Sequence, residues 1–214
     1  MSKPSGDAQC RVVIGPARLE PTGSRRLAVG GIVGPVGFVA AWVVAGARLD
    51  TYSPVGDAIS ELARSGTSAR DLMTLGFLAF AVGVGAAAIA IRGALPGPSW
   101  VALLVAATAT AGVAATPLGS RLEPGHRWFA GVGYLALALA PALAVGPLRR
   151  MGRPLAAGLA TAIAITVGLS LLAGSAGDQT NGLLQRFGLT LGDCWIVWVS
   201  AATLAGTVGA RQRA

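Results

Sequence analysis

Six apolar runs of about 20 residues constrain this chain most strongly, because a segment of that length crosses the hydrocarbon core of a bilayer as one helix. They occupy residues 27–46, 72–91, 99–117, 128–146, 154–174 and 192–210. No charged residue stands in the middle of any run, and Asp193 lies only at the outer margin of the last one. The runs are too long and too rich in Gly and Ala for barrel strands. We therefore predict an all-α, polytopic membrane bundle of six transmembrane helices.

The composition agrees with a membrane domain. The chain is 53% hydrophobic and only 12% charged, and its mean hydropathy is +0.64, which is too apolar for an ordinary soluble domain. Residues 1–26 mix Pro, Gly, Ser and Arg without periodicity and are predicted to form a disordered basic tail. Residues 27–210 then make a single transmembrane domain, and residues 211–214 make a second short tail.

Charge is distributed unevenly between the two predicted sides. The two tails with the second and fourth loops hold eleven basic residues against Asp7 and Glu20, whereas the other three loops hold six basic residues against seven acids. Basic residues are retained on the cytoplasmic side, so we expect both termini in the cytoplasm. Because the net charge of +8 is split among short segments beside the membrane, the expected partner is the lipid bilayer and not nucleic acid. The oligomeric state stays open.

The longest polar interval, residues 47–71, holds four of the nine acidic residues. Ser53 followed by Pro54 predicts a helix start. Polar side chains then recur at three- and four-residue spacing on one predicted helical face, namely Asp57, Ser60, Glu61 and Arg64. Ser68 and Asp71 have capping-box spacing ahead of the second apolar run. The interval is expected to be a short surface helix that leads into a membrane helix.

Two further patterns concern packing and the membrane boundary. Small residues four apart predict close helix contacts, as in Gly30 and Gly34 of the first run and Ala79, Gly83 and Ala87 of the second. Residues 177–193 alternate polar and apolar side chains, which predicts a short interfacial helix on the outer leaflet. A predicted aromatic belt near the outer boundary consists of Trp42, Trp128, Phe129, Trp195 and Trp198.

The outer loops gather polar side chains of mixed charge above an apolar bundle, which suits a molecule with a polar head and a greasy tail. Arginine would hold a phosphate or carboxylate through its planar fork, while the tail lies between glycine-lined helices. The candidate ligand-binding residues are Arg64, Arg121, Arg127, Asp178, Gln185 and Arg186.

The same loops hold residue types that catalysis uses. His126, the only histidine, would act as a base, with Ser60 or Ser120 as nucleophile and Asp57 or Glu61 as the orienting carboxylate. Alternatively, Asp57 or Glu61 would donate a proton to a prenyl chain or other lipid. The chain has no Gly-x-Ser-x-Gly elbow, no His-Glu-x-x-His pair and no second histidine, so we expect no metal and no cofactor.

Three stretches resemble a known family. They are YSPVGDAISELARSG, PLGSRLEPGHRWFAGVGYLAL and NGLLQRFGLTLGDCWIV. Together they look like the bacterial integral-membrane family called domain of unknown function 998, over roughly residues 27–210. The resemblance implies a multi-helix protein of the bacterial inner (plasma) membrane and brings no catalytic residues.

Three classes of function are consistent with the sequence. The first is an accessory or binding protein that holds a lipid or amphiphile headgroup at an extracytoplasmic polar cap. The second is a lipid- or prenyl-modifying enzyme (a hydrolase, transferase or cyclase), and the third is a small transporter. Transport ranks last because no span carries a charge near its middle.

Overall fold

The computed structural model describes residues 25–175 and 180–208, and this part of the chain is helical throughout with no strand. The elements are η1 (Leu27–Val29), α2 (Gly30–Ala47), η2 (Ile59–Ala63), α3 (Arg70–Ala94), α4 (Ser99–Ala115), α5 (Glu123–Arg150), α6 (Pro154–Ser175) and α7 (Asn181–Leu204). Five helical segments are long and apolar enough to cross a membrane, η1 and α2 counting as one, and α4 is a shorter apolar helix. These observations confirm the predicted all-α membrane bundle.

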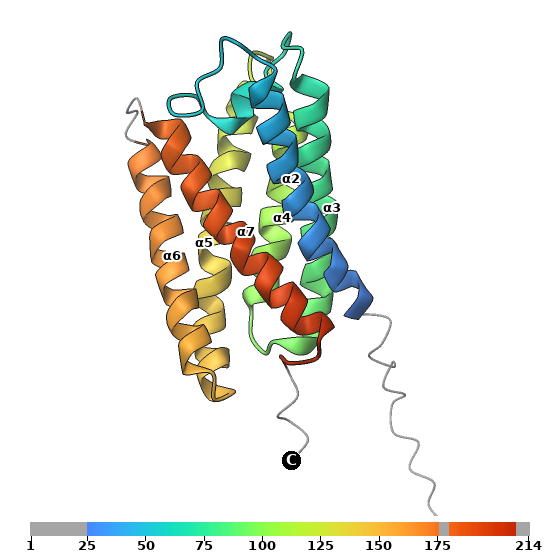
Figure 1. Ribbon diagram of the computed structural model, residues 1–214, viewed down its shortest axis with the longest axis vertical. Coiled ribbons are helices and arrows are strands. Elements are labelled where there is room, and N and C mark those ends of the chain that lie inside the picture. Colours follow the sequence, from blue (N-terminus) through green and yellow to red (C-terminus); the bar gives the residue numbers. More distant parts are fainter. Residues whose placement is uncertain (1–24, 176–179, 209–214) are drawn as a thin grey trace, which may run out of the picture.

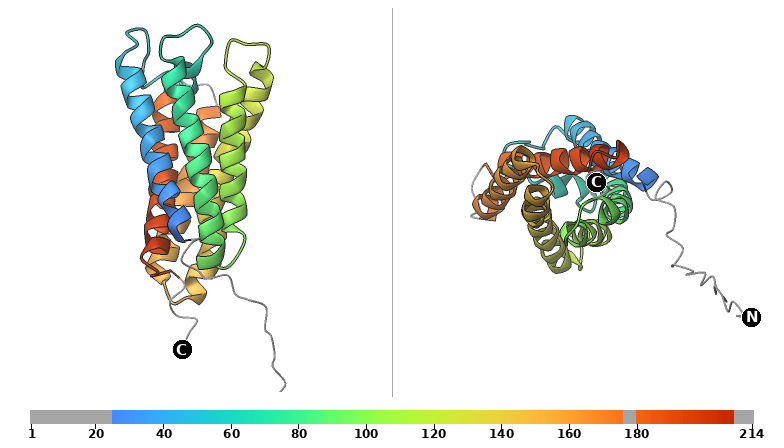
Figure 2. Two further views of the ribbon diagram at one scale, coloured as in Figure 1. Left: turned by 90° about the vertical axis from the view of Figure 1, so that its right-hand side faces the viewer. Right: turned by 90° about the horizontal axis from the view of Figure 1, so that it is seen from below.

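The long helices stand side by side in sequence order and form a closed ring. Each packs against the next, and α7 returns to contact α2 (Figures 1 and 2). The α2–α3 loop, the α4–α5 loop, the end of α6 and the start of α7 lie at one end, which we call the loop end; the other is the turn end (Figure 1). The first helix begins and α7 finishes at the turn end, as a six-span chain requires. That the turn end faces the cytoplasm stays a prediction.

Small residues bring α2 and α3 into backbone contact, as their spacing predicted. A Cβ atom added to Gly30 would lie 2.5 Å from the carbonyl oxygen of Gly83, and one added to Gly34 would lie 3.0 Å from the carbonyl oxygen of Ala79. Helices in a bilayer associate by such close packing, because lipid offers no hydrophobic driving force between them. Many large apolar side chains on the outside of the ring are exposed, for example Leu155 at 85% and Val82 at 73%.

The last helix differs most from the prediction. It begins at Asn181 instead of residue 192 and ends at Leu204 instead of residue 210. The predicted interfacial helix over 177–193 is therefore wrong, because the described part of that segment forms the first half of α7. Leu183 and Phe187 are exposed on its outside, while Arg186 is buried against the bundle. Arg186 and Asp193 are buried on its inner side, and the mean hydropathy of α7, 1.4, is the lowest of the five candidate spans.

This shift moves three predicted boundary residues. Asp193 stands near the middle of the 24-residue α7 and not at its margin. Trp195 and Trp198 follow it into the second half of the helix, toward the turn end, so they do not belong to an aromatic belt at the loop end. The expectation that no span carries a charged residue in its middle was the reason to rank transport last, and it no longer holds.

The predicted surface helix after Ser53 is also wrong. Residues 54–57 form turns in which the amide of Gly56 donates to Ser53 Oγ at 3.2 Å, and only η2 is helical. The predicted cap at Ser68 is likewise absent from the described structure: α3 has Ala69 at its N-cap, without a side-chain hydrogen bond. A single hydroxyl bonding a nearby amide stabilises a turn as readily as a helix start.

Candidate functional site

The side chain of Arg186 fastens the 48–69 loop to α7. Arg186 is 8% exposed. Its Nη1 atom donates to the carbonyl oxygens of Pro54 at 2.5 Å, Asp57 at 3.0 Å and Gly182 at 2.8 Å. Its Nη2 atom donates to the hydroxyl of Tyr52. Hydrogen bonds from an ionised donor are the strong ones, so the shape of this loop depends heavily on one guanidinium group.

Aromatic rings enclose the same guanidinium group. The ring centroids of Trp42 and Tyr52 lie 5.4 and 5.3 Å from Cζ of Arg186, within cation–π range. Burial raises the pKa of Tyr52, although the Arg186 charge acts in the opposite direction. The neutral hydroxyl therefore accepts from Arg186 and donates to the carbonyl oxygen of Ala58 at 3.2 Å.

Two neighbouring residues complete the attachment of the loop. Gln185 Oε1 accepts a hydrogen bond of 2.7 Å from the amide of Ile59, at the start of η2. Gly182 lies directly under the loop, where an added Cβ would stand 2.7 Å from Arg186 Nη1 and 2.9 Å from the carbonyl oxygen of Pro54. Glycine is required at this position because the loop backbone passes over the helix at contact distance.

Both acids of the predicted catalytic set are used within the loop itself. Asp57 Oδ2 accepts a hydrogen bond of 2.7 Å from the amide of Ser53. Glu61 Oε2 lies 2.6 Å from Arg64 Nε, and this ion pair raises the pKa of Arg64. Neither acid lines the cavity described below.

The remaining predicted ligand contacts are dispersed. Arg121 is exposed at the loop end. Arg127 is paired with Glu123 at 2.7 Å, has a side chain 77% exposed, and borders the cavity. Asp178 lies outside the described residues. The structure therefore does not gather the predicted arginines into one cluster.

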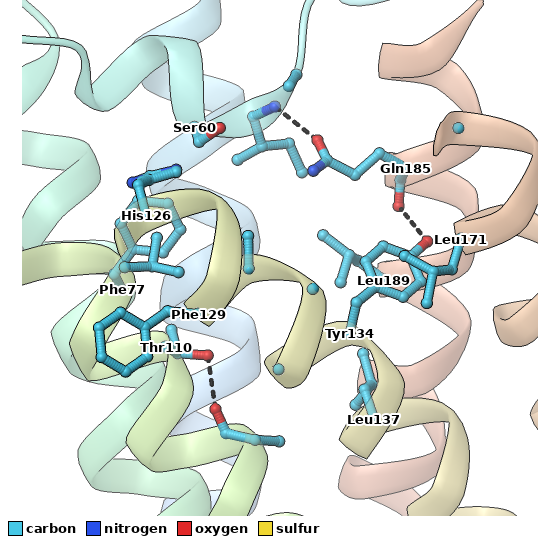
Figure 3. A pocket seen from close by; sticks show the side chains of 18 of the residues that line it. Ser60, Phe77, Thr110, His126, Phe129, Tyr134, Leu137, Leu171, Gln185 and Leu189 are labelled. Carbon is cyan, nitrogen blue, oxygen red and sulfur yellow. Dashed lines mark hydrogen bonds between the residues drawn. The ribbon is translucent and has the colours of Figure 1, made fainter. Parts of the chain in front are cut away.

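A cavity of about 650 Å³ opens inside the loop-end half of the ring. Its volume is in the range of small-molecule binding sites. All six long helices and η2 contribute to its wall. At the loop end the wall is polar, with Ser60, His126, Arg127, Asn181 and Gln185. Further in it is mostly apolar and aromatic, with Phe38, Phe77, Phe80, Phe129 and Leu137; Figure 3 shows this change from polar to apolar lining.

His126 lies in the polar part of the wall and is 3% exposed. Its Nδ1 atom is 2.7 Å from the carbonyl oxygen of Thr116. Because a carbonyl oxygen only accepts, Nδ1 carries the hydrogen and Nε2 is left as an acceptor. Within the described residues Nε2 has no partner. Of the five predicted catalytic residues, His126 and Ser60 line the cavity and Ser120, Asp57 and Glu61 do not; Figure 3 shows His126 and Ser60 near its loop end.

A hydroxyl pair lies deeper in the wall and was not predicted. Tyr134 Oη and Ser170 Oγ are 2.7 Å apart, which links α5 to α6. The Tyr134 hydroxyl also contacts the carbonyl oxygen of Gln185 on α7 at 3.3 Å, and Figure 3 shows this bond. The sequence signal for this pair was Tyr134, a single tyrosine within an apolar run, because a buried tyrosine hydroxyl needs a hydrogen-bond partner.

Asp193 is the most unusual lining residue. It is 4% exposed, and among the described residues neither carboxylate oxygen has a hydrogen-bond partner. Its position was misjudged because the helix was predicted to begin beside it. Elsewhere in the described chain, no three His, Cys, Asp or Glu side chains gather into a group able to hold a metal ion.

The ring of apolar helices and its half-polar cavity define a polytopic helical membrane protein with an internal pocket. The chain belongs to the family described as protein of unknown function (DUF998), whose model matches residues 32–202. This confirms the resemblance stated from the three motif stretches. No curated protein and no solved structure matches the chain.

Proposed function

We propose that this protein binds an amphiphile, such as a single-chain lipid, inside the ring of helices. The observation that carries the proposal is the cavity of about 650 Å³, polar at the loop end and lined by phenylalanines further in. An amphiphile gains most when each of its parts meets a surface of its own kind. The polar group would lie near His126, Gln185 and Asn181, and the chain would lie along Phe77 and Phe80.

The contacts around Arg186 support a preformed site. The loop segment that contributes Ser60 and Ile59 to the cavity wall is held by Gln185 and Arg186 through backbone hydrogen bonds. A rigid wall lowers the entropic cost of binding, because less of the protein has to be ordered by the ligand. Arg186 thus acts on the ligand indirectly, through the loop, while Arg127 stands at the mouth of the cavity.

Photocrosslinking tests this proposal. The full chain would be reconstituted in nanodiscs with a photoreactive single-chain lipid that carries a diazirine in its chain, and labelled residues would be mapped by mass spectrometry. We expect labels on cavity residues such as Phe77 and Phe129. Ala130→Trp should fill part of the cavity and reduce these labels, whereas Ala162→Trp on the exposed surface of α6 should not. Labelling confined to the outer surface, unchanged by Ala130→Trp, would refute the proposal.

A second candidate function is an acyl-transfer or hydrolase activity on such a molecule. It is favoured by the tautomer of His126, whose Nδ1–H is held by a backbone carbonyl while the buried Nε2 has no partner among the described residues, in a residue that lines the cavity together with Ser60. A histidine in this tautomer can act as a base for a serine nucleophile once Ser60 Oγ comes within hydrogen-bond reach of Nε2. A fluorophosphonate probe should then label Ser60, and His126→Gln should abolish labelling. Equal labelling of wild type and Ser60→Ala would exclude this activity.

A further inference from the structure

Asp193 lines the inner part of the cavity, and the two oxygens of its carboxyl group are buried. It is nearly fully buried and lines the cavity wall, and both of its oxygens lack a partner within the described residues. Burying a polar group without a hydrogen bond is unfavourable, and burying an unpaired charge is far more so. A carboxyl group in this position therefore calls for a donor that the described part of the protein does not provide.

The surrounding groups do not supply that donor. Of the titratable side chains in the cavity wall, Arg127 and His126 belong to the loop end, and the Tyr134 hydroxyl is engaged with Ser170 and with a carbonyl oxygen. Arg186, on the same helix, directs both Nη atoms toward the loop. Asp193 lies eight residues beyond Gln185, which is about 12 Å along a helix at 1.5 Å per residue. Loop-end cations are thus separated from Asp193 by the apolar part of the wall.

We infer that Asp193 recognises an amine on the bound molecule, so that the ligand is a lipophilic amine whose ammonium group pairs with this carboxylate. This inference rests on the proposed amphiphile binding and specifies the chemistry of the ligand. An ammonium group provides three donors and a positive charge, whereas a carboxylate provides only acceptors. The two satisfy one another in a pocket where water is largely replaced by apolar side chains, and there such a pair is stronger than in water.

The wall near the carboxyl group suits the rest of such a molecule. Leu137, Leu189 and Phe80 line the cavity together with Asp193, so an apolar body attached to the amine would be covered by apolar side chains. Because the loop end of the cavity is also polar, a ligand that satisfies both ends has an amine at its inner end and a second polar group near Gln185. A simple alkylamine tests the inner contact by itself.

The first test compares three probes of equal chain length on the wild-type protein. Dodecylamine, dodecan-1-ol and dodecanoate would be measured by equilibrium binding to the full chain in phosphatidylcholine nanodiscs, with empty nanodiscs subtracted. We expect dodecylamine to bind at least about tenfold more tightly than dodecan-1-ol, and dodecanoate to bind most weakly, because the alcohol lacks the charge that pairs with a buried carboxylate and dodecanoate carries the opposite one. Equal binding of the amine and the alcohol would overturn the inference while leaving amphiphile binding intact.

The second test removes the charge with the isosteric change Asp193→Asn. The preference for amine over alcohol should fall to within about threefold, whereas dodecan-1-ol should bind as before and so report an intact cavity. Asp71→Asn is the matched control, since Asp71 is exposed at the start of α3 and is outside the cavity. Retention of the preference in Asp193→Asn would refute the role of Asp193. Failure of all three probes to bind the wild type would refute both this inference and the proposed function.

Discussion

Two buried charged side chains on α7 have opposite surroundings. Arg186, in the half of α7 near the loop end, donates to three carbonyl oxygens and one hydroxyl group. Asp193, near the middle of the same helix, is buried to a similar degree, with 4% exposure against 8%, and has no hydrogen-bond partner among the described residues. Burial alone therefore does not distinguish a structural charge from a functional one; the partners do.

The wall of the cavity also differs between the loop end and the region near Asp193. At the loop end, Gln185 and Arg186 bond the backbone of the loop and so fix its shape. Near Asp193, the wall is mainly apolar and a single polar group is left over. A group that stabilises the fold should cost stability when removed, whereas a group kept for a ligand should not.

The largest effect is expected for Arg186→Met. Removing the guanidinium leaves the carbonyl oxygens of Pro54 and Asp57 and the Tyr52 hydroxyl without their donor, so the free energy of unfolding should fall by about 3 kcal/mol or more. Titration with SDS in mixed micelles measures it. Arg64→Met is the control, because Arg64 is half-exposed and pairs with Glu61, and it should cost less than about 1 kcal/mol. Equal losses in both variants would contradict the structural role of Arg186.

Asp193→Leu is expected to change the free energy of unfolding in the opposite direction from Arg186→Met. Without added ligand, replacing an unpartnered buried carboxyl group by an apolar side chain should leave the free energy of unfolding unchanged or raise it by about 1 to 2 kcal/mol. The same SDS titration detects the change, with Asp193→Asn alongside to separate charge from polarity. A loss of more than about 1 kcal/mol in both variants would mean that Asp193 is paired within the fold.

A smaller effect than that of Arg186→Met is expected where the loop crosses α7. Gly182→Ala places a Cβ against the loop carbonyl of Pro54 and the Arg186 guanidinium, and should cost about 1 to 3 kcal/mol. Gly168→Ala on α6 is the matched change, since an added Cβ there has no atom within 4 Å, and it should gain up to about 1 kcal/mol from helix propensity. Hydrogen exchange should locate the change in residues 48–69. Faster exchange at the turn end instead would show that the loop is not what Gly182 supports.

Most of the fold was predictable because five of the six spans are apolar on all sides. Their limits differ from the predicted ones by only a few residues, as at α6, predicted over 154–174 and observed as Pro154–Ser175. The start of α7 was missed because polar side chains on its inner face interrupt the apolar run. The four-residue spacing of this segment indicates the start of α7, because Leu183 and Phe187 lie outside and Gly182 and Arg186 lie inside.

The candidate site was predictable in part. Alternating loops predicted that Ser60 and His126 lie at the same end, and they share the cavity. The role of Arg186 was not predictable, because its acceptors are backbone carbonyls, one of them 132 residues away in the sequence. Every residue has a backbone carbonyl oxygen, so the sequence does not show which of them a side chain will bind. Only the folded structure identifies these acceptors.

The smallest effect belongs to Tyr52, whose hydroxyl links Arg186 to the carbonyl oxygen of Ala58. Tyr52→Phe should lower the free energy of unfolding by about 1 kcal/mol at pH 7. Burial raises the pKa of Tyr52 in the folded state, so the stability that the neutral phenol contributes is complete below its unfolded pKa of about 10 and is lost as the pH rises further. The difference between wild type and Tyr52→Phe, followed by SDS titration from pH 7 to 11, should therefore shrink with pH. A difference that grows instead would mean that the Arg186 charge outweighs burial and favours the phenolate.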